Sequence, residues 1–403
     1  MHMDPTPITA AAPSDPFEVE VVHTEAGLKA LKAAWDDLCL RDPDAHIFLS
    51  WAWTRASFHA AGQGWSVLVV RRAGDGGCVA ILPLSQRTRW SESAGMVQTE
   101  LKAGGRGLLS PFTGFLCDPA EEAPAIAALA RSLAAMPWAR LSLLYAAPAA
   151  RMDALAAALE AEGLETAQKR YVDRVTKADK LTTPVFSLPA SFGAVLDTLI
   201  PGDLARAYSA WRDKRGAPEA RLTLVKPASI EAALTVLEAL AARLGPEEAD
   251  RIARAAPLLR AAAAQDLLFL PILWKGKMPV AAAAHVFDAD FGDMIRLFAL
   301  APEDAAGQEA LHFLTLYALE WTFANDGIDF HFGRDADSSA ALLPTRGVES
   351  RYLSVRRPGA TPETGFDPRA LGDALGLMRR FIEAGETAKA LALCTQIEEV
   401  VQG

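Results

Sequence analysis

The sequence predicts an α/β protein of the α+β kind, with two domains, mixed and mostly antiparallel sheets flanked by helices, and a helical C-terminal tail. Its 403 residues suit two or three domains at about 150 residues each. Apolar runs of strand length alternate with helical patterns through both halves. In the second half, only short polar breaks separate the runs Leu268–Trp274, Val280–Phe287 and Phe291–Leu300, which is typical of an antiparallel meander.

The first domain is expected over residues 17–183, after a disordered tail at residues 1–16. The tail is rich in Pro and Ala and lacks the basic and apolar segments of a secretory signal. Apolar and polar residues alternate from Phe17, as in a half-buried strand. Helices are expected at Ala120–Met136 and Pro148–Glu162, the second with Pro in its first turn and Gly163 just beyond its end.

The second domain is expected over residues 184–357, around a long helix at Gly307–Asn325. That helix is apolar on every face and has few charges, which indicates burial. Strands are expected to follow at Ile328–Arg334 and Arg351–Arg357. A linker rich in Pro, Gly and Thr then leads into C-terminal helices over residues 358–403, whose expected role is packing or homo-oligomer contacts.

Composition argues against several classes of protein. Lys and Arg number 40 against 50 Asp and Glu, a net charge of −10, so a sequence-independent grip on nucleic acid is not expected. The four cysteines lack metal-ligand spacing, and we expect isolated thiols and no metal. No apolar run reaches the ~20 residues that span a bilayer, so a cytoplasmic protein is expected.

Polar residues on the strand Ile328–Arg334 are the first candidates for chemistry. Asp329 and His331 share one face of a strand that is otherwise apolar. One interpretation is a satisfied polar network, and the other is a general base at His331 held by Asp329 or by another partner. In the meander, His285 and Arg296 stand among apolar residues, and His285 is either a core histidine or a pocket residue beside Arg296.

Several segments together carry a family resemblance. They are Phe48–Trp53 (F-x-S-x-x-W), Gly77–Leu84, Leu188–Gly216, Gly276–Ala282, Gly327–Gly333 and Arg346-Gly347. The chain resembles the GNAT superfamily in its CelD/BcsL-like, cellulose-biosynthesis-type branch, and it is similar to the FemAB-type aminoacyltransferases. In Gly327–Gly333, His331 stands where that branch has an Asp. The resemblance covers roughly residues 17–357 and implies tandem GNAT-like domains, of which the second binds the donor.

The resemblance also implies where an acyl-CoA co-substrate would bind. Its arm would pair with the strand ending at Leu300 and Ala301, and its pyrophosphate would lie on backbone N–H groups at the start of the long helix. Those groups belong to Ala305, Ala306, Gly307 and Gln308. The segment Asp304–Glu309 departs from the family's phosphate-binding pattern and keeps only its middle glycine. CoA binding is therefore weak, the donor is not CoA, or the site has lost its function.

The activity that the resemblance implies is transfer of an acyl group, first of all acetyl, to an amine or a sugar hydroxyl. Envelope or exopolysaccharide metabolism is the associated setting. Arg334 and Arg346 are further pocket candidates, and Tyr352 is the candidate acid that returns a proton to the leaving thiolate. Two alternatives stay open, namely a FemAB-like aminoacyltransferase that uses aminoacyl-tRNA and a non-catalytic scaffold with the same fold.

Overall fold

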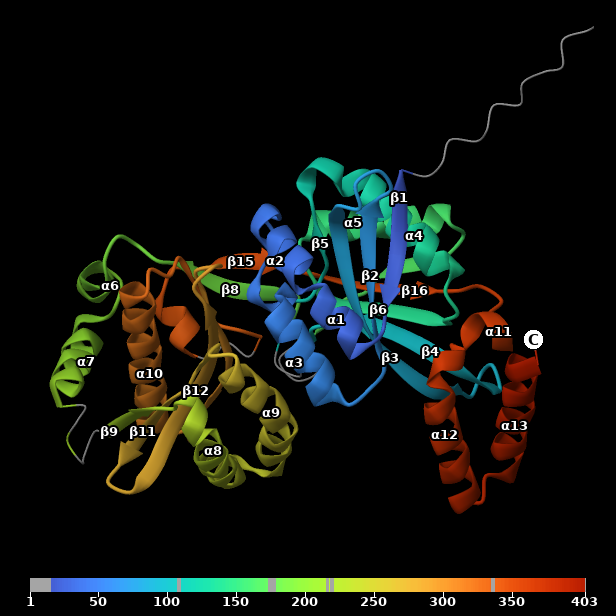
Figure 1. Ribbon diagram of the computed structural model, residues 1–403. Coiled ribbons are helices and arrows are strands. Elements are labelled where there is room, and N and C mark those ends of the chain that lie inside the picture. The colour runs from blue at the N-terminus through green and yellow to red at the C-terminus, as the bar shows by residue number, and fades with distance from the viewer. Residues whose placement is uncertain are drawn as a thin grey trace, which may run out of the picture.

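A computed structural model describes residues 16–106, 110–172, 179–214, 217, 221–334 and 338–402. Within these residues the chain forms two eight-stranded sheets, each with helices on both faces (Figure 1). The tail expected at residues 1–16 lies outside the described residues except for Pro16. The predicted α+β class with two mixed, mostly antiparallel sheets is confirmed.

The first sheet has the order β1-β2-β3-β4-β6-β16-β7, with the short β5 beside β3. Its strands are β1 (Phe17–Val22), β2 (Trp65–Arg72), β3 (Cys78–Ser91), β4 (Met96–Ala103), β5 (Leu116–Cys117), β6 (Arg140–Ala146), β7 (Glu165–Gln168) and β16 (Arg351–Arg356). The β4–β6 pair is parallel and the other pairs are antiparallel.

The second sheet has the order β15-β8-β14-β13-β12-β11-β9, with β10 beside β12. Its strands are β8 (Thr182–Ser187), β9 (Arg221–Leu224), β10 (Leu268–Phe269), β11 (Pro271–Lys275), β12 (Met278–Asp288), β13 (Asp293–Leu300), β14 (Asp329–His331) and β15 (Arg346–Glu349). The predicted meander is confirmed by the antiparallel pairs of β12 with β10, β11 and β13. The β13–β14 pair is parallel, so each sheet has one parallel pair.

The chain crosses between the two sheets twice. β8 follows β7 in the chain but pairs with β14 and β15 of the second sheet. β16 follows β15 but returns to the first sheet, between β6 and β7. The expected second domain at residues 184–357 therefore differs from the sheets, because Arg351–Arg356 belongs to the first sheet and β8 already begins at Thr182.

Helices cover both faces of each sheet. In the first half they are α1 (Glu25–Ala30), α2 (Lys32–Arg41), α3 (Trp51–Ala61), α4 (Glu122–Ala135) and α5 (Ala149–Ala161). In the second half they are α6 (Phe192–Thr198), α7 (Gly202–Lys214), α8 (Ile230–Leu244), α9 (Pro246–Ala264) and α10 (Ala305–Ala324). α10 packs with α6 and α7 on one face of the second sheet, while α8 and α9 cover the other face. The long buried helix expected at Gly307–Asn325 is thus confirmed as α10.

The two halves share a core at their junction. Phe48, Trp53 and Phe112 of the first half pack in one buried cluster with α8, α9 and the second sheet. The indole Nε1 of Trp53 donates to the carbonyl oxygen of Gly105 at 2.7 Å, and Ser50 caps α3 by accepting from the Trp53 N–H. The three aromatics of Phe48–Trp53 are buried, so they anchor a helix start in the core.

The C-terminal segment consists of α11 (Pro362–Gly365), α12 (Leu371–Glu383) and α13 (Thr387–Gln402). α12 and α13 pack against the first sheet through a small cluster that includes Val97, Phe366 and Leu393. The side-chain amide of Gln396 exchanges two hydrogen bonds of 2.8 Å with the backbone of Val97, as a neighbouring strand would. Among the described helices, none is long and apolar enough to cross a bilayer.

Candidate active site

Strands β13 and β14 form a fork. They run in parallel from the pair Asp293–Asp329 to the pair Ile295–His331, which is the last to join them. β13 then continues to Leu300, and in the described chain this part has a strand partner only on its β12 side. The free backbone edge beyond the fork can accept an extended ligand as an added strand. His331 therefore stands at the point where such a ligand would enter the sheet.

A buried imidazole and two carboxylates meet at the fork. His331 is 6% exposed, and its Nε2 lies 3.5 Å from Oδ1 of Asp293. Asp329, the predicted partner, instead pairs with the guanidinium of Arg346, with Nη2 and Oδ2 2.6 Å apart. Neither ring nitrogen of His331 makes a hydrogen bond within the described chain. The imidazole therefore has unused hydrogen-bonding capacity in a buried setting, next to the Asp293 carboxylate.

The same three side chains are the candidate metal ligands of the described chain. One ligand atom each from Asp293, Asp329 and His331 lie within 4.8 Å of one another. Two carboxylates and an imidazole suit a divalent cation. The Arg346 guanidinium competes with a cation for Asp329, so the arrangement fits a proton-transfer pair better than a metal centre.

The first half adds a second histidine and an aromatic ring to the site. The ring of Phe112 lies edge-on to His331, with ring centroids 5.7 Å apart, and the His46 ring lies 5.7 Å from Phe112. Burial lowers the pKa of His46 to about 4, despite the opposing effect of the Asp293 carboxylate. His46 is therefore a neutral ring at pH 7, able to donate from one nitrogen and accept at the other.

These groups line a cavity of about 260 Å³ at the junction of the two halves. The lining comprises Asp44, His46, Phe112, Ala147, Pro148, Ala149, Asp293, Asp329, His331, Arg346, Val348 and Glu349. The polar groups converge from β13, β14, β15 and the loop before α3, while the apolar floor comes from the first half. A concave pocket with a few convergent polar groups is the usual form of a small-molecule site.

A buried ion pair holds the loop that carries Asp44 and His46. The Arg151 guanidinium makes two hydrogen bonds with the carboxylate of Asp42, at 2.8 and 3.0 Å, and both side chains are at most 1% exposed. The same carboxylate accepts from the backbone N–H of Cys117 at 2.9 Å. Removing one partner of such a pair leaves an uncompensated buried charge. Arg151 thus fixes one wall of the pocket without touching its interior.

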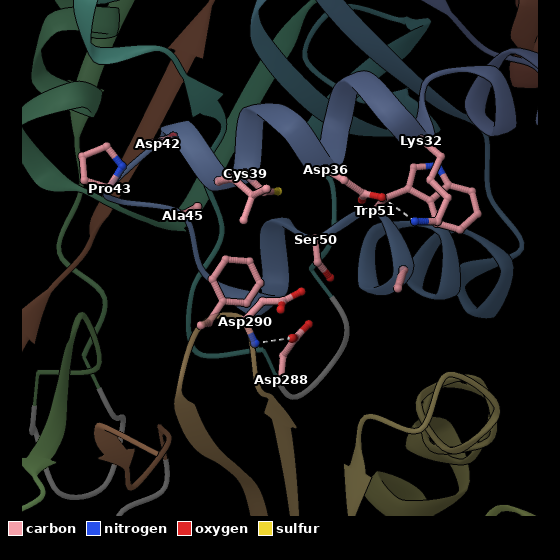
Figure 2. Close-up of a pocket in the computed structure, with 13 residues that line it drawn as sticks. Lys32, Asp36, Cys39, Asp42, Pro43, Ala45, Ser50, Trp51, Asp288 and Asp290 are labelled. Carbon is pink, nitrogen blue, oxygen red and sulfur yellow. Dashed lines mark hydrogen bonds and ion pairs between the residues drawn. The ribbon is translucent and has the colours of Figure 1, made fainter. Parts of the chain in front are cut away.

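A second cavity of about 480 Å³ lies on the other side of that loop (Figure 2). Figure 2 shows α2, with Asp36 and Cys39, facing the β12–β13 turn that carries Asp288 and Asp290. Burial, together with the nearby carboxylates, raises the pKa of Asp288. Burial also raises the pKa of Cys39 to about 12, so this thiol stays protonated. The junction is therefore acidic around both cavities.

The start of α10 carries a negatively charged side chain, that of Asp304. Asp304 is the N-cap residue, and its Oδ1 accepts from the backbone N–H of Gly307 at 2.7 Å. A Cβ at residue 307 would lie 2.0 Å from the carbonyl oxygen of Pro302, so the close approach of helix and strand end requires glycine. Of the predicted phosphate-binding N–H groups at Ala305, Ala306, Gly307 and Gln308, that of Gly307 is thus occupied by a carboxylate.

His285 and Arg296 form a buried pair under α10. They are cross-strand neighbours on β12 and β13, and each is at most 2% exposed. Burial, reinforced by the Arg296 charge, lowers the pKa of His285 to about 3. Arg296 Nε donates to the carbonyl oxygen of Phe332 at 3.2 Å. The expectation that they line an open pocket is not met, because both side chains lie among the aromatic rings of the core.

Arg334 and Tyr352 lie in a different group from His331. The Arg334 guanidinium lies over the ring of Tyr145, 4.8 Å from its centroid. Tyr352 is on β16, and its ring packs edge-on against Tyr171, with centroids 6.3 Å apart. Neither residue lines the His331 cavity. Tyr352 departs from its predicted place because β16 joins the first sheet.

Of the twelve lining residues, only Asp329, His331 and Arg346 were predicted from the sequence, and the three that matter most among the others are Asp293, His46 and Phe112. Asp293 opens a strand after a turn, where an acidic residue is unremarkable, and only the register of β13 against β14 brings it to His331. His46 and Phe112 reach the site through packing between the two halves. The sole sequence signal for His46 is a histidine beside the F-x-S-x-x-W segment, which is not enough to identify a pocket residue.

Comparisons with known proteins describe the fold. No family model matches the chain, and no curated protein matches it. The crystal structure of FemX resembles it with a TM-score of 0.54 and 9% sequence identity, over 83% of this chain and 96% of FemX.

Two further solved structures are similar. A tandem GNAT protein from the clavulanic acid biosynthesis pathway has a TM-score of 0.46 and 14% identity, over 85% of this chain and 100% of that one. L-PGS from Bacillus licheniformis has a TM-score of 0.42 and 11% identity, over 84% and 94% of the two chains. The chain has a tandem GNAT-like fold, of the kind found in FemX, with a helical C-terminal segment.

Proposed function

We propose that this protein is an acyltransferase in which His331, supported by Asp293, is the general base. The observation that carries the proposal is a buried imidazole at the fork between β13 and β14, beside a carboxylate and facing a pocket. Acyl transfer needs a group that takes the acceptor's proton as the new bond forms. The FemX-like fold supports this class of reaction, and the resemblance to CelD/BcsL-like acetyltransferases agrees with it.

In the proposed step, the acceptor N–H or O–H lies against His331 in the cavity at the junction. The acceptor atom attacks the acyl carbonyl carbon while Nδ1 of His331, the ring nitrogen that does not face Asp293, takes its proton. The tetrahedral intermediate then expels the donor's sulfur or oxygen, which receives that proton from the imidazolium. Asp293 stabilises the imidazolium between the two events, as a carboxylate does for a catalytic histidine. Proton transfer of this kind does not require Tyr352.

The lining of the cavity favours an amine over a sugar hydroxyl as acceptor. Asp44, Asp293, Asp329 and Glu349 surround the pocket, and Arg346 is the one cation in its described lining. A carboxylate-rich pocket attracts an ammonium group and lowers the cost of bringing it to His331. Amino sugars combine such a group with the carbohydrate setting suggested by the CelD/BcsL resemblance, so they are the first acceptors to test.

The donor is either acyl-CoA, as the GNAT-like fold suggests, or an aminoacyl ester. The free edge of β13 from Leu297 to Leu300 supports either, because both carry an extended arm next to the acyl carbon. One observation favours the second candidate, an aminoacyltransferase that uses aminoacyl-tRNA. The carboxylate of Asp304 occupies the helix terminus that would otherwise bind the CoA pyrophosphate.

The decisive experiment supplies both donors in parallel. Purified protein is incubated with acetyl-CoA or a mixed pool of aminoacyl-tRNA, together with glucosamine or a short amino-sugar polymer, and products are identified by mass spectrometry. We expect an N-acylated acceptor with one donor class, and loss of that product in His331→Ala. Product formation that His331→Ala leaves unchanged would contradict the role of His331, and a lack of turnover with every donor would favour the scaffold alternative.

A further inference from the structure

An ion pair between Arg346 and Asp329 forms part of the wall of the His331 cavity. Nη2 of Arg346 lies 2.6 Å from Oδ2 of Asp329, and both residues line the cavity. The Arg346 side chain is 55% exposed, whereas that of Asp329 is 15% exposed. The guanidinium therefore covers a largely buried carboxylate from the solvent side, and it is the one cation in the described lining.

Few contacts hold the Arg346 side chain in that position. Its strand, β15, lies at the end of the second sheet and pairs with β8 alone in the described chain. Apart from Asp329, the hydrogen-bond partner of Arg346 in the described chain is the hydroxyl of Ser187, with Nε and Oγ 3.4 Å apart. An ion pair with one partner half in water contributes little to stability, because water solvates the separated charges almost as well. The pair can therefore open at low cost.

The pair leaves hydrogen-bonding capacity unused behind it. Oδ1 of Asp329 is buried and has no hydrogen-bond partner in the described chain. The same holds for both ring nitrogens of His331, which is 6% exposed. Buried polar atoms are nearly always hydrogen-bonded, so each exception requires a physical reason. A ligand with several N–H donors would provide the missing partners.

A primary ammonium group has the properties that this position requires. It carries a positive charge, as the guanidinium does, and it has three N–H donors on one atom. Polar atoms of Asp293, Asp329 and His331 lie within 4.8 Å of one another, so a single small group can reach all three. The Arg346 guanidinium, in contrast, bonds to Asp329 alone among these three residues of the described chain. An acceptor's ammonium group is therefore a better partner for these atoms than Arg346 is.

We propose that Arg346 is a specificity-determining residue, whose guanidinium holds the place of the acceptor's ammonium group on Asp329 until that group displaces it. This role rests on the proposed acyltransferase function, since it concerns the acceptor of that reaction. A cationic amine replaces the ion pair that it breaks, whereas a neutral hydroxyl would leave the largely buried charge of Asp329 uncompensated. The internal pair thus selects primary amines and excludes sugars that have only hydroxyl groups.

Isothermal titration calorimetry on the full chain, without a donor, tests this role. The probes are glucosamine and glucose, which differ by the amine. We expect the wild type to bind glucosamine and not glucose, and Arg346→Gln to bind glucosamine about fivefold more tightly, because the amine no longer competes with an internal cation. A structural role of Arg346 would give the opposite sign. Arg260→Gln is the matched control, since Arg260 forms a similar half-exposed pair with Glu231 outside the cavity lining.

A double-mutant cycle separates displacement from a general effect of charge. If Arg346 competes through Asp329, Arg346→Gln should give no gain in glucosamine affinity in an Asp329→Asn background. A gain of the same size in that background would come from long-range repulsion alone and would overturn the assignment. An Arg346→Gln protein that binds glucosamine no more tightly than wild type would overturn it as well, as would a lack of glucosamine binding at millimolar concentration in both proteins.

A measurement on the wild type keeps the test valid if Arg346→Gln does not fold. The ¹H–¹⁵N NMR signal of Arg346 Nε should shift when glucosamine is added and stay in place with glucose, and a signal that glucosamine leaves unmoved contradicts displacement. The failures of the two proposals stay distinguishable. Glucosamine binding with the expected signs but no turnover refutes only the acyltransferase step, whereas turnover without the affinity gain refutes only the role of Arg346.

Discussion

Two neighbouring regions of the second sheet were expected to serve one donor, and they differ in what their side chains provide. At the fork, His331 and Asp293 are polar groups in a buried setting that packing alone does not require. At the start of α10, Asp304 satisfies the helix by itself and leaves a negative charge where phosphates were expected. The first region holds the groups that the proposed proton transfer needs, whereas the second holds a side chain that stabilises a helix.

The difference teaches that a fold supplies positions, and side chains decide what each position does. Both regions have the backbone geometry that the tandem GNAT-like fold implies, namely a fork between parallel strands and a helix start next to it. The side chains at the fork include an imidazole and a carboxylate, whereas those at the helix start include an acidic cap. Four experiments test this contrast, taken from the largest expected effect to the smallest.

The largest effect is expected from His331→Ala. Loss of a general base typically reduces the rate by about 10²–10⁴-fold, so kcat/KM for acyl transfer should fall by that factor. The measurement is a steady-state assay with the donor and the acceptor that give a product in the mass-spectrometric experiment. His59→Ala is the matched control, because His59 is an exposed histidine on α3, and its activity should equal that of wild type. Equal losses of kcat/KM in His331→Ala and His59→Ala would contradict a catalytic role of His331.

A smaller loss is expected when the two carboxylates are changed separately. Asp293→Asn removes the negative charge next to His331 and should reduce kcat about 10–100-fold, since the imidazolium loses its stabilising partner. Asp329→Asn breaks the pair with Arg346 and should act mainly on KM for the acceptor. Comparison of kcat and KM for the two variants checks this. If Asp329→Asn gives the larger loss in kcat, Asp329 is the partner of His331 during the reaction.

The next prediction concerns His285, a buried histidine on the face of the second sheet that α10 covers. Its pKa is about 3 when folded and about 6.5 when unfolded, so the unfolded chain binds the extra proton first and stability falls as the pH drops below 6.5. Between pH 6.5 and 5.5 this histidine should cost about 1 kcal/mol of unfolding free energy. Urea unfolding of wild type and His285→Phe at both pH values measures the difference. A pH response that the substitution leaves unchanged would contradict burial of a neutral ring.

The smallest effect is expected at the start of α10. Asp304→Ala removes the N-cap and should lower the unfolding free energy by about 1 kcal/mol, whereas Asp304→Asn keeps the cap and should cost less. Urea unfolding of the pair distinguishes cap from charge. If CoA phosphates bind at this terminus, Asp304→Asn should also tighten CoA binding through loss of repulsion. Unchanged CoA affinity in Asp304→Asn would indicate that the phosphates bind elsewhere.

Much of the fold follows from local pattern. The meander and α10 were predicted because apolar runs, polar breaks and an uncharged helical stretch are properties of contiguous segments. The sheet to which Arg351–Arg356 belongs was not predicted, because the choice between the two sheets depends on pairing with Arg140–Ala146, far away in the chain. Local alternation predicts a strand equally well in either sheet.

The candidate site divides in the same way. Alternation along β14 identified Asp329 and His331 as neighbours on one face. It could not identify Asp293, which depends on strand register, or His46, which depends on packing between the halves. His285 and Arg296 are polar residues in apolar strands, like His331, but they lie on the face that α10 covers. The sequence alone does not show which face of the second sheet a helix covers and which face borders a pocket.

The return of β16 to the first sheet has a consequence for cooperativity. The first sheet contains β16 from the second half of the chain, so the first half alone is not a complete folding unit. A single cut between the halves would leave one fragment without β16 and the other with an unpaired one. We therefore expect the lobes to melt in one transition, and we expect the first-half fragment to be soluble only when a co-expressed second-half fragment supplies β16. The interlock also restricts rigid-body separation of the lobes, which keeps the junction pocket assembled.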